Sequence, residues 1–293
     1  MQNILLATDF SKNAENALPF AINLVKKLNG KLYLLHAYEY PMFSLKEAFS
    51  FDIKVEYLEK IINGVRLKAH EKFNQIIINN NLSYIKHRAL LRKGNVKKEI
   101  LNAIKINDID LVIMGTRGAA AEKGFFVKRI TKNIIQQASC PVFVVPKSAQ
   151  FNKISKIVYL SNFKHDETNI INHCNEFAKL YHAHLVILHI SDEKNIQHLY
   201  NNEVSTLEKQ NIEVIKTAID KFAYHKITYK EIVSKTVIDG INEFIKIDHP
   251  DVIVMTTYTS TLFEKLFHKS LTKKMLFHTN IPLMVYNGNL FCE

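Results

Sequence analysis

The 293-residue sequence is 47% hydrophobic and 23% charged, the balance of an ordinary soluble globular protein. Its net charge of +11 is uneven, because residues 1–146 hold 22 Lys and Arg against 12 Asp and Glu, whereas residues 147–293 hold 17 against 16. No apolar run approaches the roughly 20 residues of a membrane span, and the first residues show neither a basic leader nor a small-residue cleavage site. We therefore expect neither a membrane protein nor a secretory signal.

From the N-terminus onward, the apolar residues predict alternating strands and helices. Short apolar runs predict strands at residues 4–8, 32–37, 87–91, 111–115 and 142–145. Helical spacing predicts helices over residues 14–28, 45–80 and 96–106. Pro19 conflicts with the first helix, so either its first turn begins later or the helix kinks at this residue.

The chain contains two copies of one unit. "ILLATDF" (4–10) matches "IVYLSNF" at an offset of 153, and "KLYLLHAY" (31–38) matches "HLVILHIS" at the same offset. Further on, "IKINDIDLVIMGT" (104–116) matches "IKIDHPDVIVMTT" at an offset of 141, as "CPVFVV" matches "IPLMVY". The first copy is therefore 12 residues longer. We expect two domains, 1–147 and 148–293.

Apolar strands separated by helices indicate parallel sheets covered on both faces. The predicted fold class is α/β, with two tandem doubly wound domains, each a five-stranded parallel sheet of order 3-2-1-4-5. Such sheets bind ligands beyond the carboxyl ends of their strands, where the strand order reverses, so Thr8-Asp9 and Gly115–Gly118 should face each other across a crevice. The terminal strands "PVFVV" and "PLMVY" should join edge to edge. This joining predicts a pseudo-two-fold intrachain dimer, and pairing of whole chains into a homodimer is left open.

The segments "ILLATDFS", "LHAYE", "LVIMGTRG" and the final "CPVFVVP" resemble the universal stress protein (UspA) family, in the tandem arrangement of its two-domain members. ATP-binding members carry Gly-x2-Gly-x9-Gly-Ser/Thr, with a further hydroxyl residue two positions later. The resemblance implies adenine and ribose contacts at the strand-one Asp, at the residue after strand two and at the Met-Gly that ends strand four. The candidate ligand-contacting residues are Thr8, Asp9, Ala37, Met114, Gly115, Arg117, Gly118, Lys128, Arg129 and Thr131.

The closing Gly-Ser of that motif is replaced in the first copy by Lys128-Arg129. A closing glycine lets backbone N–H groups approach phosphates at a helix start. Two readings stay open: Arg117, Lys128 and Arg129 form a cationic clamp for phosphate, or these cations point into solvent from a vacated loop. The second copy departs further, so we expect it to bind no nucleotide. Its residues at the motif positions are Asn162, Thr256, Thr259, Lys269, Ser270 and Thr272.

Other combinations of residues indicate little chemistry. His182 and His184, with His189 or His173, lack a cysteine or acid at a matching ligand spacing, so we expect no metal, and no catalytic group is assigned. The scattered Cys140, Cys174 and Cys292 indicate reduced thiols in a cytoplasm. The lysines of the basic first half are dispersed, so we rank nucleic-acid binding last; a steep salt dependence of binding would reveal it.

The resemblance implies a cytoplasmic universal stress protein that acts as a non-enzymatic binding or signalling module in the stress response. Nucleotide binding is expected to be weakened in the first copy and lost in the second. The alternative is an ATP- or AMP-binding protein with slow ATP hydrolysis in the first copy. No cofactor is assigned firmly; ATP, AMP or another small phosphate-bearing ligand would bind in the first copy only.

Overall fold

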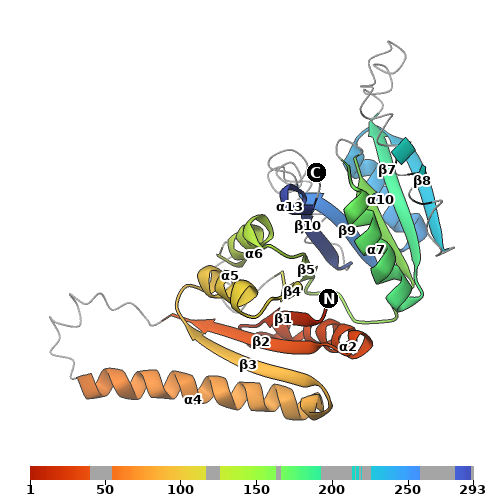
Figure 1. Cartoon of the computed structure of the whole chain (residues 1–293). Helices are drawn as coiled ribbons and strands as arrows, with labels where there is room; N and C mark the ends of the chain where they lie inside the picture. Colours follow the sequence, from red (N-terminus) through yellow and green to blue (C-terminus); the bar gives the residue numbers. More distant parts are fainter. Residues whose placement is uncertain are drawn as a thin grey trace. The chain divides into compact units, whose positions relative to one another are not determined.

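The chain forms two compact units, Met1–Cys140 and Pro141–Glu293, drawn in Figure 1. The computed structural model describes residues 1–39, 55–116, 126–162, 166–192, 213–214, 216–217, 219, 226–257 and 281–291. Each unit contains a mostly parallel sheet with helices, which confirms the predicted α/β fold class. The predicted boundary between residues 147 and 148 and the pseudo-two-fold relation of the copies stay predictions.

The first unit has four parallel strands in the order β3-β2-β1-β4. Its elements are β1 (Asn3–Ala7), α1 (Lys12–Glu15), α2 (Leu18–Leu28), β2 (Lys31–Tyr38), α4 (Val55–Asn79), η1 (Leu82–Tyr84), β3 (Lys86–Lys93), α5 (Val96–Ile106), β4 (Leu111–Gly115) and α6 (Phe126–Gln137). The strand order reverses between β1 and β4, as predicted for the candidate crevice.

In the second unit the order is β5-β10-β9-β6-β7-β8, which contains the full predicted order of the second copy. Its elements are β5 (Val142–Val145), β6 (Lys156–Ser161), α7 (Thr168–Tyr181), β7 (His184–Asp192), β8 (Ile227–Ser234), α10 (Val237–Asp248), β9 (Val252–Thr257), β10 (Leu283–Asn287) and α13 (Gly288–Phe291). The terminal strands β5 and β10 pair antiparallel, with Met284 opposite Phe143, so the predicted edge-to-edge joining of these strands is confirmed.

Pro19 is accommodated by a late helix start. α1 is a single turn capped by Ser11, and α2 begins at Leu18, which places Pro19 in its first turn. Proline fits there because the first turn of a helix has no internal partner for its N–H groups. Of the two alternatives left open by the sequence, the helix begins later. The predicted helix over 45–80 is described only from Val55, since residues 40–54 lie outside the described part of the chain.

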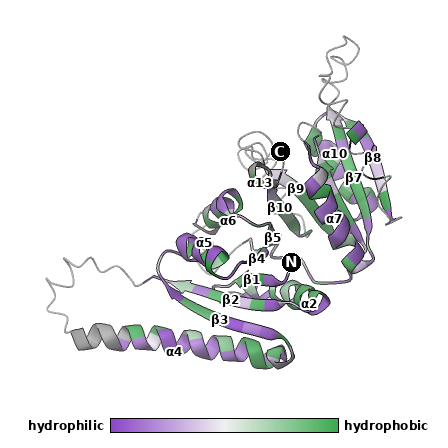
Figure 2. Ribbon diagram, in the orientation of Figure 1, coloured by the Kyte–Doolittle hydropathy of each residue, from purple (hydrophilic) through white to green (hydrophobic). Residues whose placement is uncertain are grey.

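The hydrophobic core of each unit is centred on the middle strands of its sheet. The central strands β1, β4, β6 and β9 are buried along almost their whole length. Figure 2 shows much of β2 and β7 as hydrophobic, whereas β3, α4 and α5 carry many hydrophilic residues. Burying such apolar surface is the main term that stabilises these sheets. Within the described residues, no helix is both long and apolar enough to cross a membrane.

An aspartate just before strand four fixes the start of the sheet in both copies. Asp110 Oδ2 accepts hydrogen bonds from the backbone N–H groups of Gln2 (2.6 Å) and Asn3 (2.8 Å). In the second unit, Asp251 Oδ2 accepts from the N–H groups of Ser155 (2.6 Å) and Lys156 (2.8 Å). Each carboxylate therefore links the backbone N–H groups at the start of strand one to the turn before strand four.

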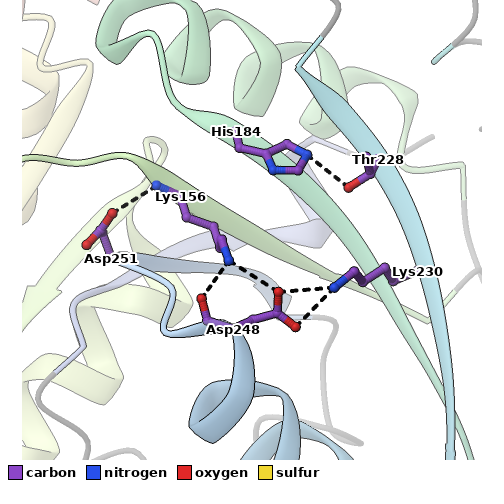
Figure 3. A network of polar contacts seen from close by, with 6 residues as sticks. All are labelled: Lys156, His184, Thr228, Lys230, Asp248 and Asp251. Carbon is purple, nitrogen blue, oxygen red and sulfur yellow. Dashed lines mark hydrogen bonds and ion pairs between the residues drawn. The ribbon is translucent and has the colours of Figure 1, made fainter.

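Next to Asp251, a group of polar and charged side chains lies at the amino ends of the strands of the second sheet (Figure 3). Asp248 contacts Lys156 Nζ at 3.2 Å and Lys230 Nζ at 3.0 Å, and His184 Nε2 lies 3.1 Å from Thr228 Oγ1. Burial opposes ionisation of Asp248, but the two lysines outweigh burial and lower its pKa. Burial and the same lysines lower the pKa of His184. These side chains lie at the amino ends of the strands, away from the candidate crevice.

Candidate nucleotide crevice of the first unit

The carboxyl ends of β1, β2 and β4 bring four of the candidate residues to one edge of the first sheet. Ala7 lies opposite Met114 in the register of β1 and β4, and the Thr8 N–H donates to Leu35 O of β2 at 2.8 Å. Thr8 and Met114 are buried, whereas Ala37 and Gly115 are half-buried. The backbone of β2 and the end of β4 thus flank the turn that follows β1, as the sequence predicted.

This turn is held by its own side chains. Thr8 Oγ1 accepts from the Phe10 N–H at 3.0 Å, and Asp9 Oδ1 accepts from the Ser11 N–H at 3.0 Å. Ser11 Oγ then accepts from the Ala14 N–H at 3.3 Å and caps α1. Phe10 has a φ of 60°, a left-handed conformation that is uncommon for an aromatic residue. The turn therefore presents Asp9 at a fixed position, with one carboxylate oxygen already engaged.

An aromatic cluster, which the sequence did not reveal, packs beside Asp9. The Phe10 ring centroid lies 4.4 Å from that of His36 and 5.1 Å from that of Phe73 on α4. Lys72 Nζ lies 5.3 Å from the centroid of the Phe10 ring, a cation–π distance. Helix α4 is thereby anchored against the turn after β1. Because Phe73 lies far away in the chain, only the packing of α4 could identify this contact.

His36 is structural. Its Nδ1 lies 2.8 Å from Thr8 O, and burial lowers its pKa, so the ring is neutral and donates from Nδ1 to this carbonyl. His189, at the equivalent position of the second copy, has its Nδ1 3.1 Å from Ser161 O. The same histidine therefore links the ends of strands one and two in both copies.

Residue 115 must be a glycine because the backbone of α1 packs against it. A Cβ added at this position would lie 2.8 Å from Asn13 O, closer than side-chain carbons approach backbone oxygens. α1 therefore packs directly on the end of β4, and the absence of a side chain at residue 115 serves this contact. The family resemblance assigned this glycine to adenine and ribose contacts; the structure gives it a packing role that needs no ligand.

The remaining candidates are placed only in part. Arg117 and Gly118 lie outside the described residues. Lys128 and Arg129 belong to the first turn of α6, where the backbone alone is described. Thr131 is 1% exposed, and its hydroxyl has no hydrogen-bond partner among the described residues. The hydroxyl that the family motif would offer to a ligand is therefore buried on the inner face of α6.

The corresponding edge of the second unit is different. Asn162 follows β6 in place of Asp9, and Thr256 occupies the Gly115 position and is buried. Glu167 stands where the first copy has Ala14, is 0% exposed, and accepts a hydrogen bond from the Ser161 hydroxyl. Glu167 was not among the residues predicted from the sequence. It could have been found there, because the offset of 153 aligns this acid with Ala14 of the first copy. Thr259, Lys269, Ser270 and Thr272 lie outside the described residues.

Metal ligation finds no support among the residues that the structure describes, where no three His, Cys, Asp or Glu side chains are grouped as ligands. His182 caps the C-terminus of α7 in a left-handed conformation, and His184 faces Thr228. Cys140 and Cys174 are free, buried thiols. Burial raises the pKa of Cys140 to about 12, so this thiol is not a nucleophile near neutral pH.

The model of the universal stress protein family matches residues 1–146 and again residues 153–287. The chain belongs to this family. A universal stress protein of Thermus aquaticus is 30% identical over 144 residues, which are 49% of this chain and 98% of that protein. It is thus similar to one copy of the repeat.

Two solved structures match over both copies. A universal stress protein from Archaeoglobus fulgidus superposes with a TM-score of 0.68 at 16% identity, covering 97% of this chain and 96% of that chain. A functionally unknown protein from Pseudomonas aeruginosa PAO1 superposes with a TM-score of 0.59 at 13% identity, covering 98% and 92%. At such identities the likeness establishes the tandem fold alone.

Proposed function

We propose that this chain is a non-enzymatic binding or signalling module of the cytoplasmic stress response, with unequal copies. The first copy retains a weakened site for a phosphate-bearing ligand such as ATP or AMP, and the second has lost it. The observation that carries this proposal is the contrast between the two carboxyl-end edges. The first keeps Asp9 and a glycine at residue 115, whereas the second has Asn162, Thr256 and the buried Glu167.

Electrostatics supports this asymmetry. Where Glu167 is ionised, its carboxylate would repel a phosphate group placed nearby. In the first copy the same position is Ala14, and the half of the chain that contains it carries 22 cationic against 12 acidic residues. Arg117, Lys128 and Arg129 follow β4 in this basic half. They would replace the backbone cradle of the family motif by a cationic clamp, in which Lys128 binds phosphate as a point charge and the two arginines bind it bidentately.

Restoring the family loop in the first copy should restore binding. We expect the parent chain to bind ATP only weakly and the double variant Lys128→Gly with Arg129→Ser to bind at least about tenfold tighter, a gain of about 1.4 kcal/mol. Isothermal titration calorimetry measures both affinities. The weak binding of the parent should fall with added salt, because exposed charges are screened over about 8–10 Å.

A matched change in the second copy provides the control. Lys269→Gly creates a Gly-Ser pair ahead of Thr272, yet it should not gain affinity, because Asn162, Thr256 and Glu167 remain. If the parent binds ATP tightly and the first-copy double variant loses this binding, Lys128 and Arg129 themselves form the binding site. AMP or ATP that co-purifies with the chain would favour the alternative of a nucleotide-binding first copy, and phosphate release from ATP would show that this copy also hydrolyses ATP slowly.

A further inference from the structure

The second unit carries titratable groups at buried positions where the first copy is apolar. At the offsets of 153 and 141, Leu6, Ala14, Ala21 and Val145 of the first copy correspond to Tyr159, Glu167, Cys174 and Tyr286 of the second. All four replacements are less than 2% exposed. Burying a polar group costs free energy unless it is hydrogen-bonded. Among these exchanges, the replacement of Ala14 by Glu167 places an ionisable carboxyl at a fully buried position.

Glu167 is the centre of this group. It immediately precedes α7, and its backbone carbonyl accepts the Ile171 N–H at 2.9 Å, so the residue forms the first turn of the helix. Its carboxyl accepts a hydrogen bond from the Ser161 hydroxyl at the carboxyl end of β6. The Glu167 side chain thus ties the start of α7 to the end of β6. In the first copy, Ala14 makes no such tie.

The groups that face this carboxyl set its charge. The pKa of Glu167 is raised to about 7, mainly by burial and to a small extent by the charge of Asp166. Hydrogen bonds from Ser161, Tyr159 and the Asn162 N–H favour the anion and oppose this rise. On α7, burial and the charge of Glu167 raise the pKa of Cys174. Behind Cys174, burial raises the pKa of Tyr286 on β10. On the side of β7, His189 Nδ1 contacts the carbonyl of Ser161.

We propose that Glu167 is a proton-controlled latch that holds the first turn of α7 against the carboxyl end of β6 when protonated and loosens that turn when ionised. A carboxyl whose pKa is higher in the closed state than in the open state favours closure at low pH. The equilibrium constant for local opening then rises with pH from about 4.5, the ordinary pKa, to about 7 and is constant above. This property is independent of nucleotide binding in the first copy.

Hydrogen exchange on the full chain tests the latch. Protection factors, already corrected for the intrinsic pH dependence of exchange, should fall for the first turns of α7 on the order of 50-fold between pH 5 and pH 8. In Glu167→Gln, which keeps the shape and cannot ionise, they should be independent of pH. The amides of α10 in the same unit should keep their protection throughout. A carbon-13 titration of the Glu167 carboxyl in the parent chain should give a midpoint near 7.

Asp166→Asn is the matched control, because Asp166 is the adjacent, exposed acid and accepts the Thr168 N–H at 2.9 Å. It should keep most of the pH dependence of α7, because the charge of Asp166 is the smallest of the causes that act on the pKa of Glu167. Three results would overturn the latch: pH-independent protection of α7 in the parent, the same pH dependence in Glu167→Gln, or an equal fall in protection of α10, which indicates opening of the whole unit. If Glu167→Gln does not fold, the carbon-13 titration of the parent chain is sufficient by itself. A midpoint of the Glu167 carboxyl near the ordinary 4.5 then overturns the latch.

Discussion

Replacing Asp251 with alanine is expected to lower the free energy of unfolding of the second unit by about 3 kcal/mol. The carboxylate accepts two backbone N–H groups, from Ser155 and Lys156, at 2.6 and 2.8 Å. Alanine leaves both donors without this acceptor, and hydrogen bonds to a charged group are stronger than neutral ones. Urea unfolding followed by circular dichroism should show a lower midpoint for one transition at an unchanged slope.

Asp251→Asn is the control for this prediction. Asparagine keeps the volume and one carbonyl oxygen that can accept both N–H groups, so its loss should be about 1 kcal/mol. Asp110→Ala should produce a comparable loss in the first unit, because Asp110 makes the same two contacts with Gln2 and Asn3. Equal losses for the alanine and asparagine variants would show that the paired backbone donors are not the reason for the effect.

Adding one methyl group at Gly115 is expected to destabilise the first unit by about 2 kcal/mol. The new Cβ would lie 2.8 Å from Asn13 O and 3.2 Å from Asn13 C, and backbone atoms cannot rotate away as a flexible side chain can. α1 must therefore shift from the end of β4. Since α1 begins within the turn that positions Asp9, any remaining ATP affinity of the first copy should fall together with stability.

Gly64→Ala is the matched control for Gly115→Ala. A Cβ at Gly64 would meet nothing within 4 Å, and the residue lies inside α4. Alanine in a helix interior is favoured over glycine by about 1 kcal/mol, so this variant should be neutral or more stable. Thermal unfolding compares the two substitutions directly. A Gly115→Ala protein as stable as the parent would mean that α1 is not held against β4 as described.

The sequence by itself determined the architecture. The repeat offsets and the alternation of apolar runs with helical segments predicted two α/β copies, their strand order and the pairing of β5 with β10, because each depends on local periodicity or on an unpaired edge. The sequence also located the conflict at Pro19, although it left a late helix start and a kink open and the structure decided for the late start. These features follow from short local patterns and from the similarity between the two halves of the sequence.

Tertiary structure alone decided what the crevice residues do. Gly115 matches a ligand motif in the sequence, yet its role in the structure depends on the backbone of Asn13, 102 positions earlier in the chain. Glu167 looks like one acid among many ahead of a helix, and only burial against β6 gives it a pKa near 7. Distances across the chain and the cost of desolvating a charge arise only when distant segments pack together, so no local pattern encodes them.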